Sequence, residues 1–145
     1  MDDGFLTLSG SVVSGIPDVD GPHRELIDLY NRIVWACEHD ETAAHVRERV
    51  RSFLMYARWH FHEEEERMRL LAYPEYDDHH RDHGRLLQDA EDFVASLGDA
   101  LRRRDAPAVA RYFRYWLSRH MASHDAKLST FIAGSINDTG VAAHS

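Results

Sequence analysis

Histidine and glutamate recur in this sequence at the spacing of one helical turn. His60 precedes Glu64 by four residues, within the stretch WHFHEEEERM, and His79 precedes His83 by four. Residues four apart in an α-helix project from the same face, so each pair could offer two ligand atoms to one metal ion. Imidazole nitrogens and carboxylate oxygens are common ligands of transition metals. A glutamate run can equally be a solvated helix face, so the direction of each side chain decides between the two interpretations.

Four segments with a 3.6-residue apolar period would position these side chains. The first would begin near Asp20 as N-cap, with Pro22 tolerated in the first turn, and end near Glu38. Pro74 would end the second helix, and Gly98 and Gly134 would stop the third and fourth. The expected helices cover about residues 20–38, 40–71, 76–97 and 107–132.

Helices of this length joined by short connections favour antiparallel neighbours. We therefore expect an all-α fold, an antiparallel up-down-up-down four-helix bundle with an extended N-terminal arm. The arm would cover residues 1–17 and the bundle residues 18–133. Residues 134–145, which are small and polar, would form a frayed C-terminal tail.

The second expected helix carries an apolar seam that continues into the first ligand pair. The seam consists of Val46, Val50, Phe53 and Ala57. Its three- and four-residue spacing leads directly to His60 and Glu64. At about 100° per residue, Glu63 lies about 80° from that inward direction, and Glu65 and Glu66 lie about 120° and 140° away. Only one glutamate of the run is thus expected to point inward.

The other three seams bring further ligand-type residues to the same end of the bundle. In antiparallel order, the starts of the first and third helices lie beside the ends of the second and fourth. The resulting layer contains His23, His60, Glu64, His79, His83 and His120. One buried histidine is usually a core residue whose ring nitrogens are hydrogen-bonded. Burying six unpartnered polar groups in one layer would cost a large desolvation free energy. A shared metal removes that cost, so we interpret the layer as a metal site.

This layer offers too many ligands for one tetrahedral ion, and no thiolate set suggests structural zinc. Imidazole with carboxylate favours iron over manganese, cobalt or zinc, and two carboxylate-linked ions would use all the ligands. Oxygen-activating di-iron bundles carry Glu-x-x-His motifs, which this sequence lacks. A histidine-rich site has less negative charge and stabilises high-valent iron less. It therefore favours O₂ binding over attack on a substrate.

The spaced set H…HxxxE…HxxxH…HxxxxD resembles the hemerythrin family, specifically single-domain bacteriohemerythrins, over about residues 16–132. The resemblance implies a non-haem di-iron centre with an oxo or hydroxo bridge that binds O₂ reversibly at an open position of one iron. One iron would be held by His79, His83 and His120. The other would be held by His23 and His60. The two irons would be bridged by Glu64 and Asp125. The family usually has Gln directly before His23, where this chain has Pro22.

Asp125 enters this set through the resemblance and against helical geometry. On a regular helix it lies about 140° from His120, whereas His124 lies on the apolar face at i+4. We follow the resemblance because a carboxylate can bridge two ions and an imidazole ordinarily cannot. His124 stays an alternative ligand or a contact behind the ligands.

Four apolar residues adjoin the ligands and are expected to form a dry O₂ pocket, a role compatible with ordinary core packing. They are Phe61, Trp116, Leu117 and Met121. Three functions follow: reversible O₂ binding for storage, delivery or sensing; a di-iron enzyme acting on peroxide or nitric oxide; and a redox-sensing signalling module. Nothing in the sequence specifies a substrate pocket or a docking motif, so we favour the first and assign no catalytic residue.

Composition restricts the partners. The formal net charge of −8 argues against nucleic acid and anionic membrane, and no apolar run approaches the roughly 20 residues that span a bilayer. The acidic start does not resemble a secretory signal, and the single Cys37 fits a reducing compartment. We expect a soluble cytoplasmic monomer whose ligand is O₂; the sequence indicates no protein partner.

Overall fold

The computed structural model describes residues 6, 14–39, 42–97, 106–122 and 124–144, without the side chains of 18, 97, 106 and 135–144. These residues form five α-helices, and the described ranges contain no strand. The helices are α1 (Pro17–Glu38), α2 (Ala43–Leu70), α3 (Tyr76–Leu97), α4 (Ala106–Ala122) and α5 (His124–His144). The all-α prediction is confirmed.

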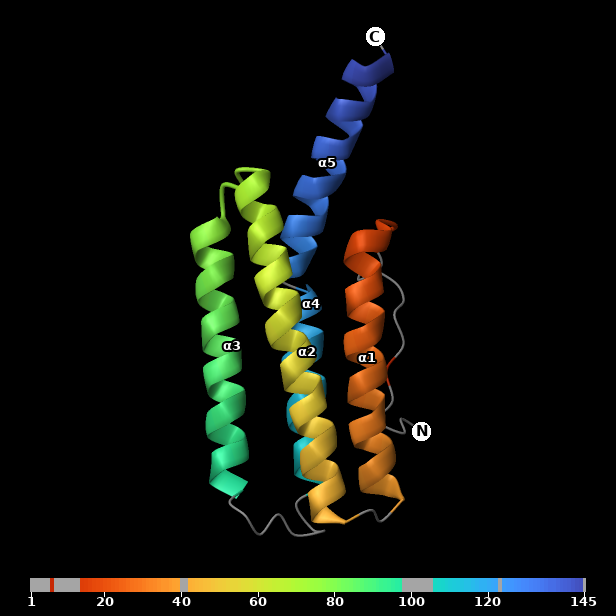
Figure 1. Cartoon of the computed structure of the whole chain (residues 1–145), viewed down its shortest axis with the longest axis vertical. Coiled ribbons are helices and arrows are strands. Elements are labelled where there is room, and N and C mark those ends of the chain that lie inside the picture. Colours follow the sequence, from red (N-terminus) through yellow and green to blue (C-terminus); the bar gives the residue numbers. More distant parts are fainter. Residues whose placement is uncertain (1–5, 7–13, 40–41, 98–105, 123, 145) are drawn as a thin grey trace.

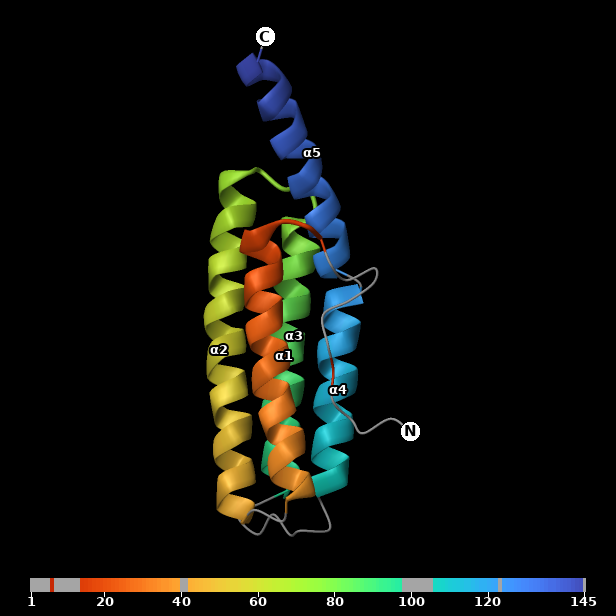
Figure 2. The ribbon, with the colours of Figure 1, turned by 90° about the vertical axis from the view of Figure 1, so that its right-hand side faces the viewer.

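The helices α1 to α4 form the expected antiparallel bundle (Figure 1). α1 packs against α2 and α4, and α2 packs against α3. α5 follows α4 at the end of the bundle where α1 begins and the α2–α3 hairpin turns, and it projects beyond that end (Figure 2). None of the described helices is long and apolar enough to cross a membrane.

The start of α1 differs from the prediction. The helix begins at Pro17, after Ile16 as N-cap, so Asp20 is not the cap and Pro22 lies beyond the first turn. The buried Asp20 carboxylate instead accepts hydrogen bonds from the backbone N–H groups of Ser14 and Gly15, each at 2.9 Å, and from the Ser14 hydroxyl at 2.8 Å. Proline suits the first helical position because its fixed φ is already helical and it has no N–H to leave unpaired.

The α2–α3 hairpin was predicted closely. At the start of α2, far from the hairpin, the Thr42 hydroxyl caps the helix by accepting a hydrogen bond from the His45 N–H at 3.2 Å. The hairpin itself lies at the other end of α2. Ala72 adopts a left-handed conformation with φ of 52°, and the Tyr73 N–H bonds the Met68 carbonyl at 2.9 Å to close the turn. Pro74 follows and prevents α2 from continuing. This turn fixes the register between the ligand-bearing faces of α2 and α3.

The fourth expected helix was wrong at its C-terminal end. The segment is described as α4 and α5 on either side of residue 123, which lies outside the described residues, and α5 continues past Gly134 to His144. A glycine inside a helix is unfavourable by only about 1 kcal/mol relative to alanine, so Gly134 does not oblige the helix to stop. α3 is described as far as Leu97; Gly98, where we expected this helix to stop, and most of the N-terminal arm lie outside the described residues. Leu6 in the arm exchanges two hydrogen bonds of 2.9 Å with the Asn31 side chain.

Two apolar clusters enclose one buried polar layer. The larger cluster fills the bundle from Val46 and Val109 up to Phe61 and Met121. The smaller one lies on the far side of the layer, toward α5, and comprises Val19, Met68, Tyr73, Leu128 and Ile132. On α2, for example, Glu64 lies between Phe61 of the larger cluster and Met68 of the smaller one. The polar layer is therefore shielded from water on both sides.

Candidate metal centre

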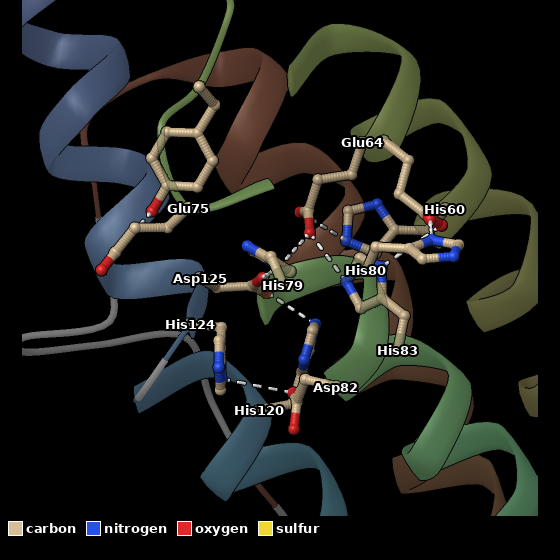
Figure 3. A network of polar contacts seen from close by, with 12 residues as sticks. His60, Glu64, Glu75, His79, His80, Asp82, His83, His120, His124 and Asp125 are labelled. Atoms are coloured by element: carbon tan, nitrogen blue, oxygen red, sulfur yellow. Dashed lines mark hydrogen bonds and ion pairs between the residues drawn. The ribbon is translucent and has the colours of Figure 1, made fainter. Parts of the chain in front are cut away.

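All seven expected metal ligands converge in this layer, with at least one contributed by every helix. They are His23 on α1, His60 and Glu64 on α2, His79 and His83 on α3, His120 on α4 and Asp125 on α5. Figure 3 shows the carboxylates of Glu64 and Asp125 pointing into one cluster of imidazoles. The five imidazoles and Asp125 are buried, and the Glu64 side chain is 8% exposed.

Glu64 divides its two oxygens between two sets of histidines. Oε1 lies 2.7 Å from His79 Nε2 and 3.0 Å from His83 Nε2, whereas Oε2 lies 3.4 Å from His60 Nε2. Burial and the negative charge of Asp125 oppose ionisation, but contacts with His79 and His83 outweigh them and lower the pKa of Glu64 to about 2. The carboxylate is thus ionised and placed as a bridging group would be.

Asp125 lies between histidines from three other helices. Its Oδ2 is 2.7 Å from His23 Nε2 and 2.7 Å from His120 Nε2, and its Oδ1 is 3.1 Å from His79 Nε2. Burial raises the pKa of Asp125, but these histidines, His120 foremost, hold it well below its ordinary value. Asp125 lies in the first described turn of α5.

The ligand atoms form two groups, each able to hold one metal ion. In each group the ligand atoms lie within 4.8 Å of one another. The first group is His23, His60, Glu64 and Asp125; the second is Glu64, His79, His83 and Asp125. Both groups contain the same two carboxylates, which is the arrangement expected for two adjacent ions with carboxylate bridges. His120 belongs to neither group and enters the layer through its contact with Asp125.

Unpartnered ring nitrogens indicate that the layer fits a cation. The Nε2 atoms of His60, His83 and His120 are buried without a hydrogen-bond partner. The Nε2 atoms of His83 and His120 lie 3.0 and 2.7 Å from a carboxylate oxygen. These distances are short enough for a hydrogen bond, so the unfavourable angle between donor and acceptor is what prevents one. An unsatisfied buried polar group costs about 1–3 kcal/mol. A metal ion bound where these lone pairs converge would remove that penalty, and the nitrogen and oxygen donor set suits a transition metal.

The histidines differ in their affinity for protons. Burial lowers the pKa of His60 to about 4 despite the charges of Glu64 and Asp125. Burial also disfavours charge on His79, but contacts with Asp125 and Glu64 outweigh it and raise the pKa of His79 to about 9. Without metal, His79 therefore carries a proton at neutral pH, and a metal ion must displace that proton to bind.

Asp125 lies close to His120 although their spacing in the sequence did not favour this. On a regular helix the two residues would be separated by about 140°. In the structure Asp125 Oδ2 lies 2.7 Å from His120 Nε2. His124 points elsewhere: it belongs to neither group, and its Nδ1 lies 3.4 Å from Asp82 Oδ2 at the edge of the site. The i+4 spacing of a regular helix thus pointed to His124, whereas the structure brings Asp125 into the ligand layer.

Glu65 was expected to face away from the site, and this expectation was wrong. Its side chain is only 14% exposed, and Oε2 lies 3.4 Å from Nδ1 of His83, while Oε1 contacts Nδ1 of His80. Metal-binding histidines commonly present their second nitrogen to a carboxylate, which fixes the ring orientation. The sequence contained a signal for this contact: the neighbouring antiparallel helix carries two histidines at positions that face Glu65.

Aromatic side chains cover the bundle side of the layer. Phe61 stacks on the His83 ring with centroids 3.9 Å apart and planes inclined by 4°, and it lies 4.8 Å from His120. Trp116 packs 5.9 Å from Phe61, and its indole N–H donates to the Leu86 carbonyl at 3.0 Å. The other two residues expected in the O₂ pocket, Leu117 and Met121, are buried in the same cluster.

Comparison with known proteins agrees with this geometry. The sequence model of one family, the Hemerythrin HHE cation binding domain, matches residues 14–132. A search of curated proteins gives no significant match. The matched range includes all seven expected ligands, and the two carboxylate-sharing groups could each hold a cation. The chain therefore belongs to the hemerythrin family, as one of its HHE cation-binding domains.

Proposed function

We propose that the chain binds O₂ reversibly at a carboxylate-bridged, non-haem di-iron centre, for oxygen storage, delivery or sensing. The observation that carries this proposal is the pair of metal groups that share Glu64 and Asp125. An iron pair supplies, when bound, the electrons and the coordination position that hold O₂. Five imidazoles and two carboxylates carry little negative charge, which favours holding oxygen over activating it for attack on a substrate.

The residues of the chain would make this binding reversible by orienting the ligands and excluding water. Glu65 holds the outer nitrogen of His83, and Phe61 lies flat against the same ring. The apolar clusters limit the access of water and protons from the two ends of the layer, which slows irreversible side reactions. Among the described residues, the side of the layer toward the larger cluster has an aromatic and aliphatic wall.

Anaerobic iron loading followed by spectra through cycles of air and argon tests the proposal. The expected result is about two irons per chain and a visible charge-transfer band that appears in air and fades under argon. Glu64→Ala is the matched control that should abolish the band. An iron-loaded, reduced wild-type chain without any reversible O₂-dependent band would refute the proposal.

Turnover of peroxide or nitric oxide is a second candidate, favoured by a cavity of about 590 Å³ that borders His60 and Glu64. This cavity would let small molecules other than O₂ approach the metal layer. The enzyme hypothesis requires turnover well above that of free iron and its loss in His60→Ala. Rates equal to those of free iron would exclude it.

We further propose that the protein works as a cytoplasmic monomer. The half-buried Cys37 is the only cysteine, and burial raises the pKa of its thiol to about 11, which keeps it protonated. Gel filtration and cell fractionation test this proposal; a stable dimer or a secreted product would contradict it.

A further inference from the structure

Asp82 on α3 is a buried charged residue that the metal centre does not account for. The buried aspartates among the described residues are Asp20, Asp82 and Asp125, and Asp82 is 7% exposed. Asp20 binds the backbone before α1, and Asp125 belongs to both metal groups, whereas Asp82 belongs to neither group. A buried carboxylate is costly to desolvate unless charged or hydrogen-bonding partners compensate it, so the partners of Asp82 indicate its role.

Asp82 contacts one partner on its own helix and one on α5. Its Oδ1 accepts a hydrogen bond from Arg85 Nη2 at 2.5 Å, and the Arg85 side chain is 60% exposed. Its Oδ2 lies 3.4 Å from Nδ1 of His124, the first described residue of α5 (Figure 3). Arg85 thus compensates the charge of Asp82 from the solvent side, while the second oxygen is directed at α5.

The contact with His124 adjoins a contact that brings Asp125 into the metal layer. His79 and Asp82 are three residues apart on α3 and are neighbours on its surface. They face two consecutive residues of α5. His79 Nε2 lies 3.1 Å from Asp125 Oδ1, and the His79 ring lies 5.5 Å from the ring of His124. α3 therefore holds the start of α5 at two adjacent points.

Two points of attachment restrict Asp125 more than one would. Further along α5, Leu128 and Ile132 pack in the smaller apolar cluster. Apolar packing is non-directional, so these residues fix the distance of α5 from the bundle better than its rotation. The polar contact between Asp82 and His124 opposes rotation of the turn that carries Asp125. Ligands must be held within about 0.5 Å of their productive positions, so such a restraint affects metal binding.

We propose that Asp82 and His124 are positioning residues: by holding the start of α5 against α3, they set the position of the Asp125 carboxylate between the two metal groups. Neither residue binds metal in this proposal, and His124 belongs to neither group. The proposal rests on the metal centre of the proposed function and not on its reversible oxygenation. Contacts behind ligands commonly change metal affinity about 10- to 100-fold, so the effect is measurable.

Cobalt(II) titration of the full-length, metal-free protein under argon, with a competing chelator, tests the proposal. Cobalt(II) accepts the same nitrogen and oxygen ligands as iron(II), and its visible spectrum reports the coordination geometry. Asp82→Ala should weaken cobalt binding about tenfold or more. It should also change the visible bands of the cobalt-saturated protein, because Asp125 is displaced. A residue that only stabilises the fold would leave these bands unchanged.

Two further variants separate the effect of position from that of charge. Asp82→Asn removes the charge but keeps an oxygen that can accept a hydrogen bond from His124, so it should restore most of the affinity and the wild-type bands. Asp78→Ala is the matched control, because Asp78 is an exposed aspartate at the same end of α3, paired with Arg81 and outside both metal groups. Its loss removes one negative charge and should leave the affinity and the spectrum unchanged.

Asp82 and His124 should also act as a unit. Adding Asp82→Ala to His124→Ala should weaken binding no further than either change alone, because each removes the same contact. If Asp82→Ala fails to fold, His124→Ala replaces it and should weaken binding and change the bands in the same way, since the His124 side chain is already 29% exposed.

Three results would each overturn the proposal: equal cobalt affinities of Asp82→Ala and Asp78→Ala, equal losses in Asp82→Ala and Asp82→Asn, or additive losses in the double variant. Oxygenation plays no part in these measurements. A wild-type protein that binds cobalt but shows no O₂-dependent band when loaded with iron would refute the proposed function alone, so the two proposals fail separately.

Discussion

Replacing Glu64 with glutamine tests the shared-carboxylate arrangement most directly. Glutamine keeps the shape of the side chain but removes its charge, and the carboxylate it replaces belongs to both metal groups. The variant should therefore lose both ions together. Glu66→Gln is the matched control, because Glu66 lies two residues away, outside both groups, in an exposed ion pair with Arg69.

The magnitude follows from the environment of Glu64. A carboxyl whose pKa falls from 4.5 to about 2 on folding contributes about 3 kcal/mol to the stability of the metal-free protein at pH 7. This contribution is present above the unfolded pKa and is lost as the pH falls toward 2. Its removal should lower the unfolding midpoint by roughly 6–12 °C in a chain of this size. Metal affinity should fall by more than about 100-fold, the upper end for residues that only support a ligand. An exposed ion pair contributes at most about 1 kcal/mol, so Glu66→Gln should barely change either quantity.

Two measurements on each variant test whether Glu64 is shared by both ions. The first is the metal content per chain after anaerobic reconstitution and desalting. The second is thermal unfolding in the presence of a chelator, monitored by circular dichroism. The expected values are two irons for the wild type and Glu66→Gln, and fewer than one for Glu64→Gln. Wild-type metal content in Glu64→Gln would refute a shared bridging carboxylate. A similar loss in Glu66→Gln would show that the effect is general rather than local.

Removing the outer contact in Glu65→Ala should weaken metal binding about 10- to 100-fold without changing the stoichiometry, as measured by chelator competition; an unchanged affinity would mean that His83 needs no outer carboxylate. The pKa of His79 is about 9 in the metal-free fold and 6.5 in the unfolded chain, so metal affinity should rise with pH up to about 9. The stability that protonated His79 gives the metal-free fold has the opposite dependence: it should be complete below pH 6.5 and lost as the pH passes 9. Isothermal titrations at several pH values measure the first effect, and a flat profile would contradict it. Phe61→Ala should destabilise the protein by about 3–5 kcal/mol in urea unfolding and shorten the life of the oxygenated form; an unaltered lifetime would exclude Phe61 from the O₂ pocket. His124→Ala should keep both metals, and loss of one would make His124 a ligand.

Periodicity alone placed the candidate ligands of the regular helices in one layer. α2 is unbroken over 28 residues, so the apolar seam from Val46 to Ala57 extrapolates accurately to His60 and Glu64. The α2–α3 hairpin was equally readable, because Pro74 cannot continue a helix. On a continuous helix, the direction in which a side chain leaves the helix axis can be computed from the residue number.

Periodicity did not place Asp125 or the end of the last helix. The inward position of Asp125 was expected from the family resemblance and not from its angle to His120, and Gly134 was taken for a stop that α5 does not make. Glu65 shows a different limit. An angle measured from one helix axis ignores a neighbouring helix, and α3 buries a residue that lies far from the inward direction.

The contact between His23 and Asp125 joins residues 102 positions apart, and that between His79 and Asp125 spans 46. In polymer terms, a metal bound at this layer closes long loops of the chain, as a covalent cross-link does. Closing a loop of about 100 residues removes about 5 kcal/mol of unfolded-chain entropy in the chain-entropy model of disulfides. With a single cysteine the chain can form no internal disulfide. The ligands are drawn from both ends of the sequence, so the metal layer would connect the first and last helices in the way that a disulfide does in other small proteins.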